Sequence, residues 1–295
     1  MVYGVWAVKF VKYQALGNDY LVVKPATVGE VDLIRLAPQL CHRNYGVGSD
    51  GLLLGPLPST RADFGLRIIN PDGSEAEKSG NGLRIFARYL WDTGRVTEAP
   101  FTIETKGGIA DALVDAAARS IRIGMGEASF QSSVVGIDGP AREVVGEVMS
   151  FAGRRLTCTG VSVGNPHCVI LGVPVNEVEA RTLGPIVEVD PRFKGRTNVQ
   201  LLRVIDRSQI EIQIWERGAG YTLASGSSAS AAACAARRLG LCDGDVSVHM
   251  PGGCLQVSID DRYGVTQTGP ATRIAEGEIS EESWDDDMAW NRQNT

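Results

Sequence analysis

Leu66-Arg-Ile-Ile-Asn70, followed nine residues later by Ser79-Gly80 and then by a helical pattern, is the stretch that decides the fold. The same pattern of a strand, a loop and a helix start recurs further along the chain. There, Ile212-Gln-Ile-Trp-Glu216 precedes Ser225-Gly226 by the same nine residues. Asn70 and Glu216 lie 146 residues apart, and so do Ser79 and Ser225. One offset shared by several landmarks indicates internal duplication of a unit of about 146 residues.

A third landmark supports the duplication. Gly17-Asn18 leads into the apolar run Tyr20–Lys24, and Gly164-Asn165 leads into His167–Leu171, at an offset of 147. Alternating apolar and polar residues predict half-buried strands in these and other segments. The further strand predictions are 64–69, 101–104, 120–124, 210–215 and 256–259. Helical pattern is scarcer and clearest at 83–91 and 229–239, so many strands with few helices predict an α+β fold.

The duplication predicts two similar lobes. We expect an N-terminal lobe over residues 1–130, a C-terminal lobe over 131–276 and an acidic tail over 277–295. The Gly- and Pro-containing stretch 136–141 is the predicted connector. Equivalent loops of two such lobes would face one another across a cleft, and ligands favour domain interfaces.

Composition excludes several classes of protein. A net charge of −6 without a run of Lys or Arg argues against a nucleic-acid surface. Six cysteines without a CxxC pair, and only three histidines, predict reduced thiols in a cytoplasmic protein and no zinc cluster. The longest uncharged stretch is rich in Gly, Ala and Ser, and the N-terminal residues lack the charged start of a signal peptide. We therefore expect neither a membrane span nor a secretory signal.

The two Ser-Gly turns offer a possible chemistry. A helix start presents free N–H groups and partial positive charge, and Gly lets the backbone approach an anion such as a carboxylate. Ser79 and Ser225 would then flank the atom next to that carboxylate, as removal and return of a Cα proton on opposite faces require. The alternative is that both serines are ordinary helix N-caps without a further function.

Several motifs, in order along the chain, resemble those of the diaminopimelate epimerase family. They are Phe10–Tyr20, Tyr45–Gly51, Asn70–Arg88, Gly164–His167, Arg196–Val199 and Glu216–Gly220. The resemblance covers most of residues 7–275. It implies two pseudo-symmetric lobes, each with a mixed or antiparallel sheet wrapped around a central helix. It also implies a cytoplasmic homodimer that acts in lysine and peptidoglycan synthesis on a small amino acid, without metal or pyridoxal phosphate.

The resemblance also assigns site residues one by one. Ser79 and Ser225 match the two catalytic positions, and Glu216 and His167 match polar residues close to the reacting centre. Gly80 and Asn81, with Gly226 and Ser227, match the backbone donors to the reacting carboxylate. The remaining matches are substrate-binding residues, of which Arg217 would pair with a carboxylate. They are Asn18, Asn70, Asn165, Asn198 and Arg217.

The reacting end departs from the family pattern, because the family has cysteine at both catalytic positions. A thiol titrates near ~8.5, whereas a serine hydroxyl is close to water at ~15.7, a gap of about 10 kcal/mol in forming the base. Helix dipoles supply at most ~2 kcal/mol, so a serine needs a neighbour that accepts its proton; His167 and Glu216 are the candidates. Gly51 replaces a family Gln, Tyr221 a family Glu, and Ser228 the second Gly of a Gly-x-Gly.

The predicted function is cofactor-independent epimerisation or racemisation at a Cα–H next to a carboxylate. One alternative is a catalytically impaired homologue, or a Cys→Ser variant, that binds an amino acid without turnover. Another is a hydroxy-amino-acid dehydratase, where one base suffices and a hydroxyl relays a proton. Gly51 and Tyr221 leave open which amino acid is the substrate.

Overall fold

The computed structural model describes residues 8–25, 32–115 and 119–280, and the chain forms two compact units. Unit 1 comprises Met1–Ile121 and Pro270–Thr295, and unit 2 comprises Arg122–Gly269. The boundaries therefore differ from those predicted at 130 and 276, and the expected connector at 136–141 lies inside unit 2. Of the predicted acidic tail, residues 277–279 continue a strand of unit 1, and 281–295 lie outside the described residues.

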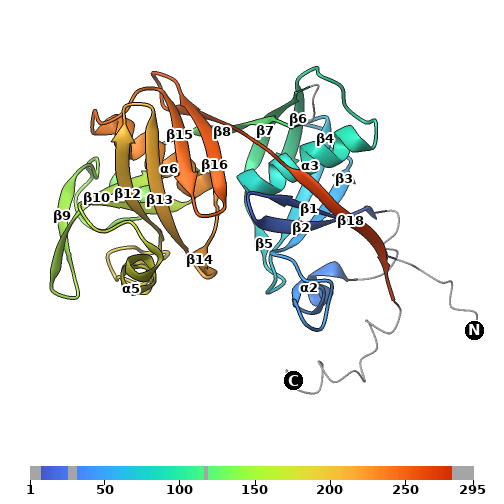
Figure 1. Ribbon diagram of the computed structural model, residues 1–295, viewed down its shortest axis with the longest axis horizontal. Helices are drawn as coiled ribbons and strands as arrows, with labels where there is room; N and C mark the ends of the chain where they lie inside the picture. The colour runs from blue at the N-terminus through green and yellow to red at the C-terminus, as the bar shows by residue number, and fades with distance from the viewer. Residues whose placement is uncertain (1–7, 26–31, 116–118, 281–295) are drawn as a thin grey trace, which may run out of the picture. The chain divides into compact units, whose positions relative to one another are not determined.

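Unit 1 is a mixed sheet with two described helices, α2 (Leu33–Cys41) and α3 (Gly80–Asp92) (Figure 1). The C-terminal strand β18 (Thr272–Ile279) pairs antiparallel with β1, which pairs antiparallel with β2. Parallel β2–β3 and β4–β6 pairs alternate with antiparallel β3–β4 and β6–β7 pairs. The other strands are β1 (Val8–Ala15), β2 (Asn18–Val23), β3 (Leu52–Leu57), β4 (Phe64–Ile69), β5 (Glu75–Ala76), β6 (Phe101–Thr105) and β7 (Gly108–Val114).

Unit 2 repeats this arrangement with its own strands and helices. Its described helices are α4 (Ser132–Val135), α5 (Glu177–Glu188) and α6 (Gly226–Arg238). Its strands are β8 (Ile121–Glu127), β9 (Glu147–Phe151), β10 (Arg154–Ser162), β11 (Pro166–Leu171), β12 (Asn198–Asp206), β13 (Gln209–Glu216), β14 (Gly220–Thr222), β15 (Asp245–Met250), β16 (Gly253–Ile259) and β17 (Gly264–Gly269).

The strand pairings follow the same order in both units. The antiparallel β10–β11, parallel β11–β12 and antiparallel β12–β13 pairs match β1–β2, β2–β3 and β3–β4. A parallel pair needs a crossover, which α2 supplies in unit 1 and α5 in unit 2. The sequence analysis missed both helices, since each contains a proline, Pro38 or Pro185, in a position that disfavours helix.

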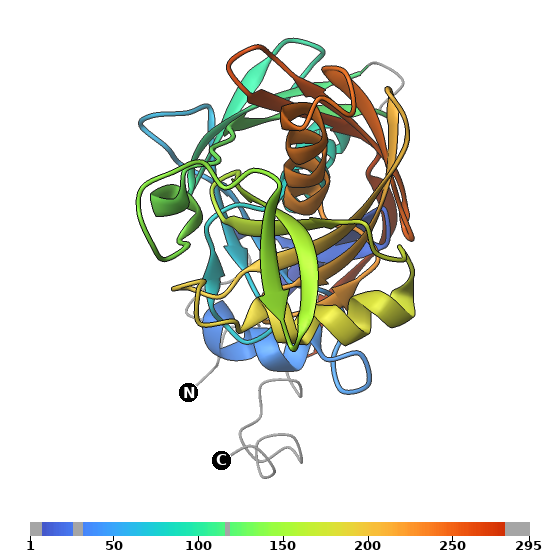
Figure 2. The same cartoon turned by 90° about the vertical axis from the view of Figure 1, so that its left-hand side faces the viewer.

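The predicted helices are the central helices of the two units, which confirms the predicted fold class. In unit 1, α3 packs against β1, β2, β3 and β7. In unit 2, α6 packs against β10–β13 and β15–β17, and strands surround it in Figure 2 (α6 in orange). Its buried residues 228–236 are Ser, Ala and Cys, whose small side chains let the strands approach closely. Both helices have 13 residues, and their starts are 146 residues apart.

Candidate active site

Ser79 is the N-cap of α3. Its backbone is extended, with φ −136° and ψ 117°, and its Oγ accepts a hydrogen bond from the Gly82 N–H at 3.1 Å. Gly80 and Asn81 follow in the first turn, where they are buried. The hydroxyl of Tyr20 lies 3.3 Å from the Ser79 Oγ. The predicted helix start therefore exists, and a second hydroxyl stands beside it.

A chain of side-chain hydrogen bonds fixes Asn18 and Asn81, two of the three predicted asparagines of unit 1. The Asn81 Nδ2 donates to the Asn18 Oδ1 at 3.0 Å, and the Arg84 guanidinium donates to the Asn81 Oδ1 at 2.6 Å. Arg84 is fully buried, and burial lowers its pKa to about 10. Because each amide oxygen faces a donor, the orientation of both amides is determined.

Charged residues continue this chain on the other side of Asn18. The Asn18 Nδ2 donates to the Asp50 Oδ2 at 2.8 Å, and Arg43 contacts both Asp50 and Asp19 at 2.8 Å. Lys12 pairs with Asp19 at 2.9 Å. Burial raises the pKa of Asp50, whereas for Asp19 the hydrogen bonds from Arg43 and Lys12 outweigh burial and lower the pKa. Together these charges hold Asn18 in place.

Asn70 makes a different set of contacts. Its backbone N–H donates to the Ser74 carbonyl at 2.8 Å, and its Nδ2 donates to the Ser74 Oγ at 2.9 Å. Its carbonyl also accepts from the Gly73 N–H at 3.0 Å. These bonds close the turn between β4 and β5, which is the ordinary structural role of an asparagine at a strand end.

Ser225 occupies the equivalent position in unit 2. It caps α6 with an extended backbone, φ −145° and ψ 127°, and its Oγ accepts from the Ser228 N–H at 3.3 Å. The Ser227 Oγ lies 3.4 Å away. Gln267 supports the first turn by donating to the Gly226 carbonyl at 2.7 Å, and a Cβ at position 226 would come within 2.6 Å of its side chain. A side chain at position 226 would therefore displace the end of the Gln267 side chain.

The other predicted residues of unit 2 gather at one end of its sheet. His167 pairs with Asn198 in the β11–β12 register, and its Nε2 lies 2.9 Å from the Asn165 Oδ1. Asn198 donates to the Pro166 carbonyl at 2.9 Å and accepts from the Arg217 N–H at 2.9 Å. Glu216 is the last residue of β13, beside Arg217. The structure thus brings together all five of these predicted residues.

The electrostatics around His167 oppose a role as a proton acceptor near neutral pH. Burial lowers its pKa to about 3, and the positive charge of Arg217 adds to this effect. Its Nδ1 is buried and has no hydrogen-bond partner among the described residues. His167 is therefore neutral at pH 7 but a weak base, because a buried imidazolium would lack solvation.

Glu188 is a site-supporting residue that the sequence analysis missed. This buried carboxylate accepts from the Trp215 Nε1 at 2.7 Å and the Gly218 N–H at 2.9 Å, and it pairs with Arg196 at 2.9 Å. It thereby fixes the loop that carries Arg217. The signal in the sequence was weak, because one acidic residue at the end of a helix does not show which loop it contacts.

Glu188→Gln is expected to destabilise the protein by about 1–3 kcal/mol, since one of the three donors to this carboxylate loses its acceptor. Urea unfolding would measure this loss, and hydrogen exchange should show faster exchange over residues 216–220. Glu179→Gln in the same helix is the control, because its partner Arg154 is an exposed residue and the expected change is below ~1 kcal/mol. Equal effects of the two changes would contradict the assigned role.

The six cysteines are poor candidates for a thiolate base. Among the described residues all six are free, and all except Cys254 are buried. Burial raises the pKa of Cys41 to about 11 and that of Cys234 to about 12, opposite to the shift that a thiolate base needs. The hydroxyls at positions 79 and 225 therefore remain the candidate proton carriers.

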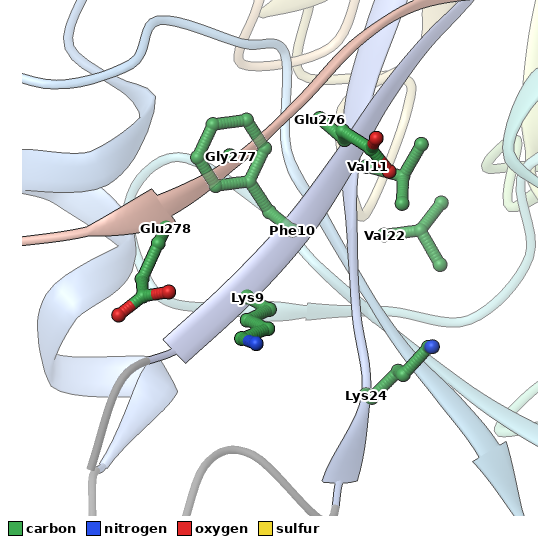
Figure 3. Close-up of a pocket in the computed structure, with 8 residues that line it drawn as sticks. All are labelled: Lys9, Phe10, Val11, Val22, Lys24, Glu276, Gly277 and Glu278. Carbon is green, nitrogen blue, oxygen red and sulfur yellow. The ribbon is translucent and has the colours of Figure 1, made fainter. Parts of the chain in front are cut away.

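A pocket of about 360 Å³ lies elsewhere in unit 1, on the face of β1, β2 and β18 (Figure 3). Phe10, Lys9 and Lys24 line it together with Glu276 and Glu278, and none of the predicted site residues does. Over the described parts of the chain, no group of three or more His, Cys, Asp or Glu side chains could hold a metal ion. No helix in those parts is long and apolar enough to cross a membrane.

Comparisons with known proteins agree on one family. The family model described as diaminopimelate epimerase matches residues 10–131 and 159–274. Diaminopimelate epimerase 2 of Nostoc sp. is 53% identical over 278 residues, which cover 93% of this chain and 96% of that protein. Diaminopimelate epimerase of Pelotomaculum thermopropionicum is 40% identical over 274 residues, covering 91% and 98%.

Solved structures show the same fold at low sequence identity. A hydroxyproline epimerase from Agrobacterium vitis aligns with a TM-score of 0.70 and 14% identity, covering 95% of this chain and 92% of that one. A PhzF-family phenazine biosynthesis protein from Bacillus anthracis aligns with a TM-score of 0.64 and 17% identity, covering 93% and 99%. At these identities the likeness concerns the fold alone.

Proposed function

Because the chain belongs to the diaminopimelate epimerase family, we propose that it inverts a carbon next to a carboxylate of diaminopimelate and that Ser79 and Ser225 carry the proton. One observation carries the proposal. Each serine caps the central helix of its unit, at the same point of the repeat, with its Oγ bonded to the N–H three residues on. We infer that these two positions are the ones where the family has cysteine.

The two helix starts support recognition of a carboxylate. The first turns after Ser79 and Ser225 are mostly buried, with Ser227 partly exposed, and carry N–H groups that the helix itself does not use. Such groups bind anions, and a bound carboxylate acidifies the adjacent Cα–H by delocalising the charge that forms. The chain's own residues would then remove the proton and return one to the opposite face.

Arg217 and its neighbours support recognition of a second charged end. Arg217 is exposed, its backbone is held by Asn198, and its Nη1 donates to the Gly195 carbonyl at 3.0 Å. The other guanidinium nitrogens can bind a distal carboxylate. Buried free thiols are consistent with the cytoplasmic location that we also propose.

Exchange in deuterium oxide tests the proposed function. The protein, incubated with LL-diaminopimelate, is expected to introduce deuterium at Cα and to form the meso isomer. Wash-in without inversion would indicate a one-base reaction, and loss of a β-hydroxyl from hydroxylated amino acids would indicate a dehydratase. Binding without exchange would identify a non-catalytic homologue. Each of these three results contradicts the proposal.

Single substitutions test the assignment of the two serines. Ser79→Ala and Ser225→Ala are each expected to abolish inversion. Each variant should still exchange deuterium into one stereoisomer only, and the two variants should prefer opposite configurations, because each keeps the base on one face. NMR of the Cα proton measures both quantities. The same stereochemical preference in both variants would rule out a two-base reaction.

A further inference from the structure

Tyr20 makes a contact that the family scheme does not use. Its hydroxyl lies 3.3 Å from the Ser79 Oγ, within hydrogen-bond distance. Tyr20 is buried, with 7% of its surface exposed, whereas Ser79 is only partly buried. A substrate at the start of α3 would therefore contact Ser79 directly. Tyr20 would reach the substrate only by way of the Ser79 hydroxyl.

Gly51 makes room for this tyrosine. A Cβ atom at position 51 would come within 2.7 Å of the Tyr20 Cε1 and 2.7 Å of the Ile69 carbonyl. These distances are shorter than any normal contact, so a side chain at position 51 would displace the ring. The position of the Tyr20 ring thus explains why glycine replaces the family's Gln at position 51. Gly51 and Ser79, both departures from the family pattern, therefore both lie next to Tyr20.

The hydrogen bonds of Ser79 leave its hydroxyl proton free to be donated. The Oγ already accepts from the Gly82 N–H at 3.1 Å, which directs a lone pair toward the helix. Its O–H can then point to the Tyr20 oxygen. Phenols titrate near ~10, several units below the ~15.7 of a hydroxyl like that of serine or water, so the phenol is the easier member of the pair to ionise.

The repeat gives an independent reason to look at this position. The offset of 147 between Asn18 and Asn165 places Tyr20 at the point that His167 occupies in unit 2. Both residues stand two positions after the asparagine, and both are buried in a strand. Each unit therefore has a titratable side chain at the equivalent place in its sheet.

We propose that Tyr20 is the proton acceptor behind Ser79, a positioning residue that lets a serine perform the proton transfer at this helix start. This inference rests on the proposed function. In the molecules whose Tyr20 phenol has first lost its proton to solvent, the Cα–H bond breaks toward the Ser79 Oγ while the Ser79 O–H bond breaks toward the Tyr20 phenolate. The carbon keeps the electron pair, the serine stays neutral, and the phenolate becomes a phenol. The reverse sequence returns a proton to carbon.

A double-mutant cycle tests this relay. Tyr20→Phe in the parent protein is expected to lower kcat for Cα deuterium exchange by at least ~100-fold with KM little changed, as for loss of a general base. In a Ser79→Cys background the same change should lower kcat by less than ~3-fold, because a thiolate needs no second base. Tyr13→Phe is the matched control, since Tyr13 is the buried register partner of Tyr20 and donates to Asp92 instead.

The outcomes separate this inference from the function on which it rests. A parent protein that exchanges no deuterium overturns both. A parent that exchanges, with Tyr20→Phe equally active, overturns the relay and leaves the proposed function intact. Equal losses in the parent and in the Ser79→Cys background would make Tyr20 a structural residue and also overturn the relay. A large loss confined to the parent supports it.

Discussion

Introducing cysteine at both helix starts, Ser79→Cys with Ser225→Cys, is expected to raise kcat for diaminopimelate inversion by about 10³-fold. The gap between hydroxyl and thiol is about seven pKa units, or about 10 kcal/mol in forming the base. Brønsted behaviour commonly expresses roughly half of such a difference in base strength in the transition state. The expected increase in kcat is therefore about three powers of ten. The relay through Tyr20 would reduce the gain at position 79.

The pattern across the cysteine variants is as informative as the size of the gain. Each single variant should speed removal of the proton from one face, while the remaining serine limits inversion. The double variant should therefore exceed the product of the two single effects on kcat. Ser230→Cys, a buried position one turn along α6, controls for the introduction of a thiol. A folded double variant without increased activity would show that these positions do not carry the proton.

Acidification from pH 7.5 to 4.5 is expected to cost about 3 kcal/mol of stability through His167 alone. Burial lowers the pKa of this group to about 3, whereas the unfolded chain titrates near ~6.5. Above pH 6.5 both states are neutral and the stability is complete. As the pH falls from 6.5 to 3, the unfolded state takes up a proton that the folded state does not, and stability is lost.

Urea unfolding at the two pH values measures this effect. Carboxylates such as Asp19 and Asp190, whose pKa values are also lowered in the folded state, contribute to the same slope. The comparison is therefore between variants: His167→Gln should remove about 3 kcal/mol from the pH-dependent loss. His249→Gln, at a histidine that is only partly buried, is the control for the loss of an imidazole. If the free energy of unfolding depended on pH identically in the parent and both variants, His167 would not be buried as a neutral group.

Much of the site could be predicted because the signals are local. A serine followed by glycine at the start of an apolar pattern predicts a capped helix, and both Ser79 and Ser225 are caps. Asn165, His167 and Asn198, which the family resemblance assigned, also meet in unit 2. Asn70, which the resemblance assigned as a binding residue, closes the turn between β4 and β5, and a turn at a strand end produces the same sequence signal as a binding residue.

The sequence by itself determined the duplicated architecture, the two central helices and the family, because repeat offset, periodicity and motif order are all written along the chain. Only the tertiary structure decided which side chains support those helix starts. The contacts of Tyr20 with Ser79, Arg84 with Asn81 and Glu188 with the Arg217 loop depend on how buried side chains meet across a folded sheet. A buried polar group takes whichever partner the packing brings within reach, and spacing along the chain does not specify that partner.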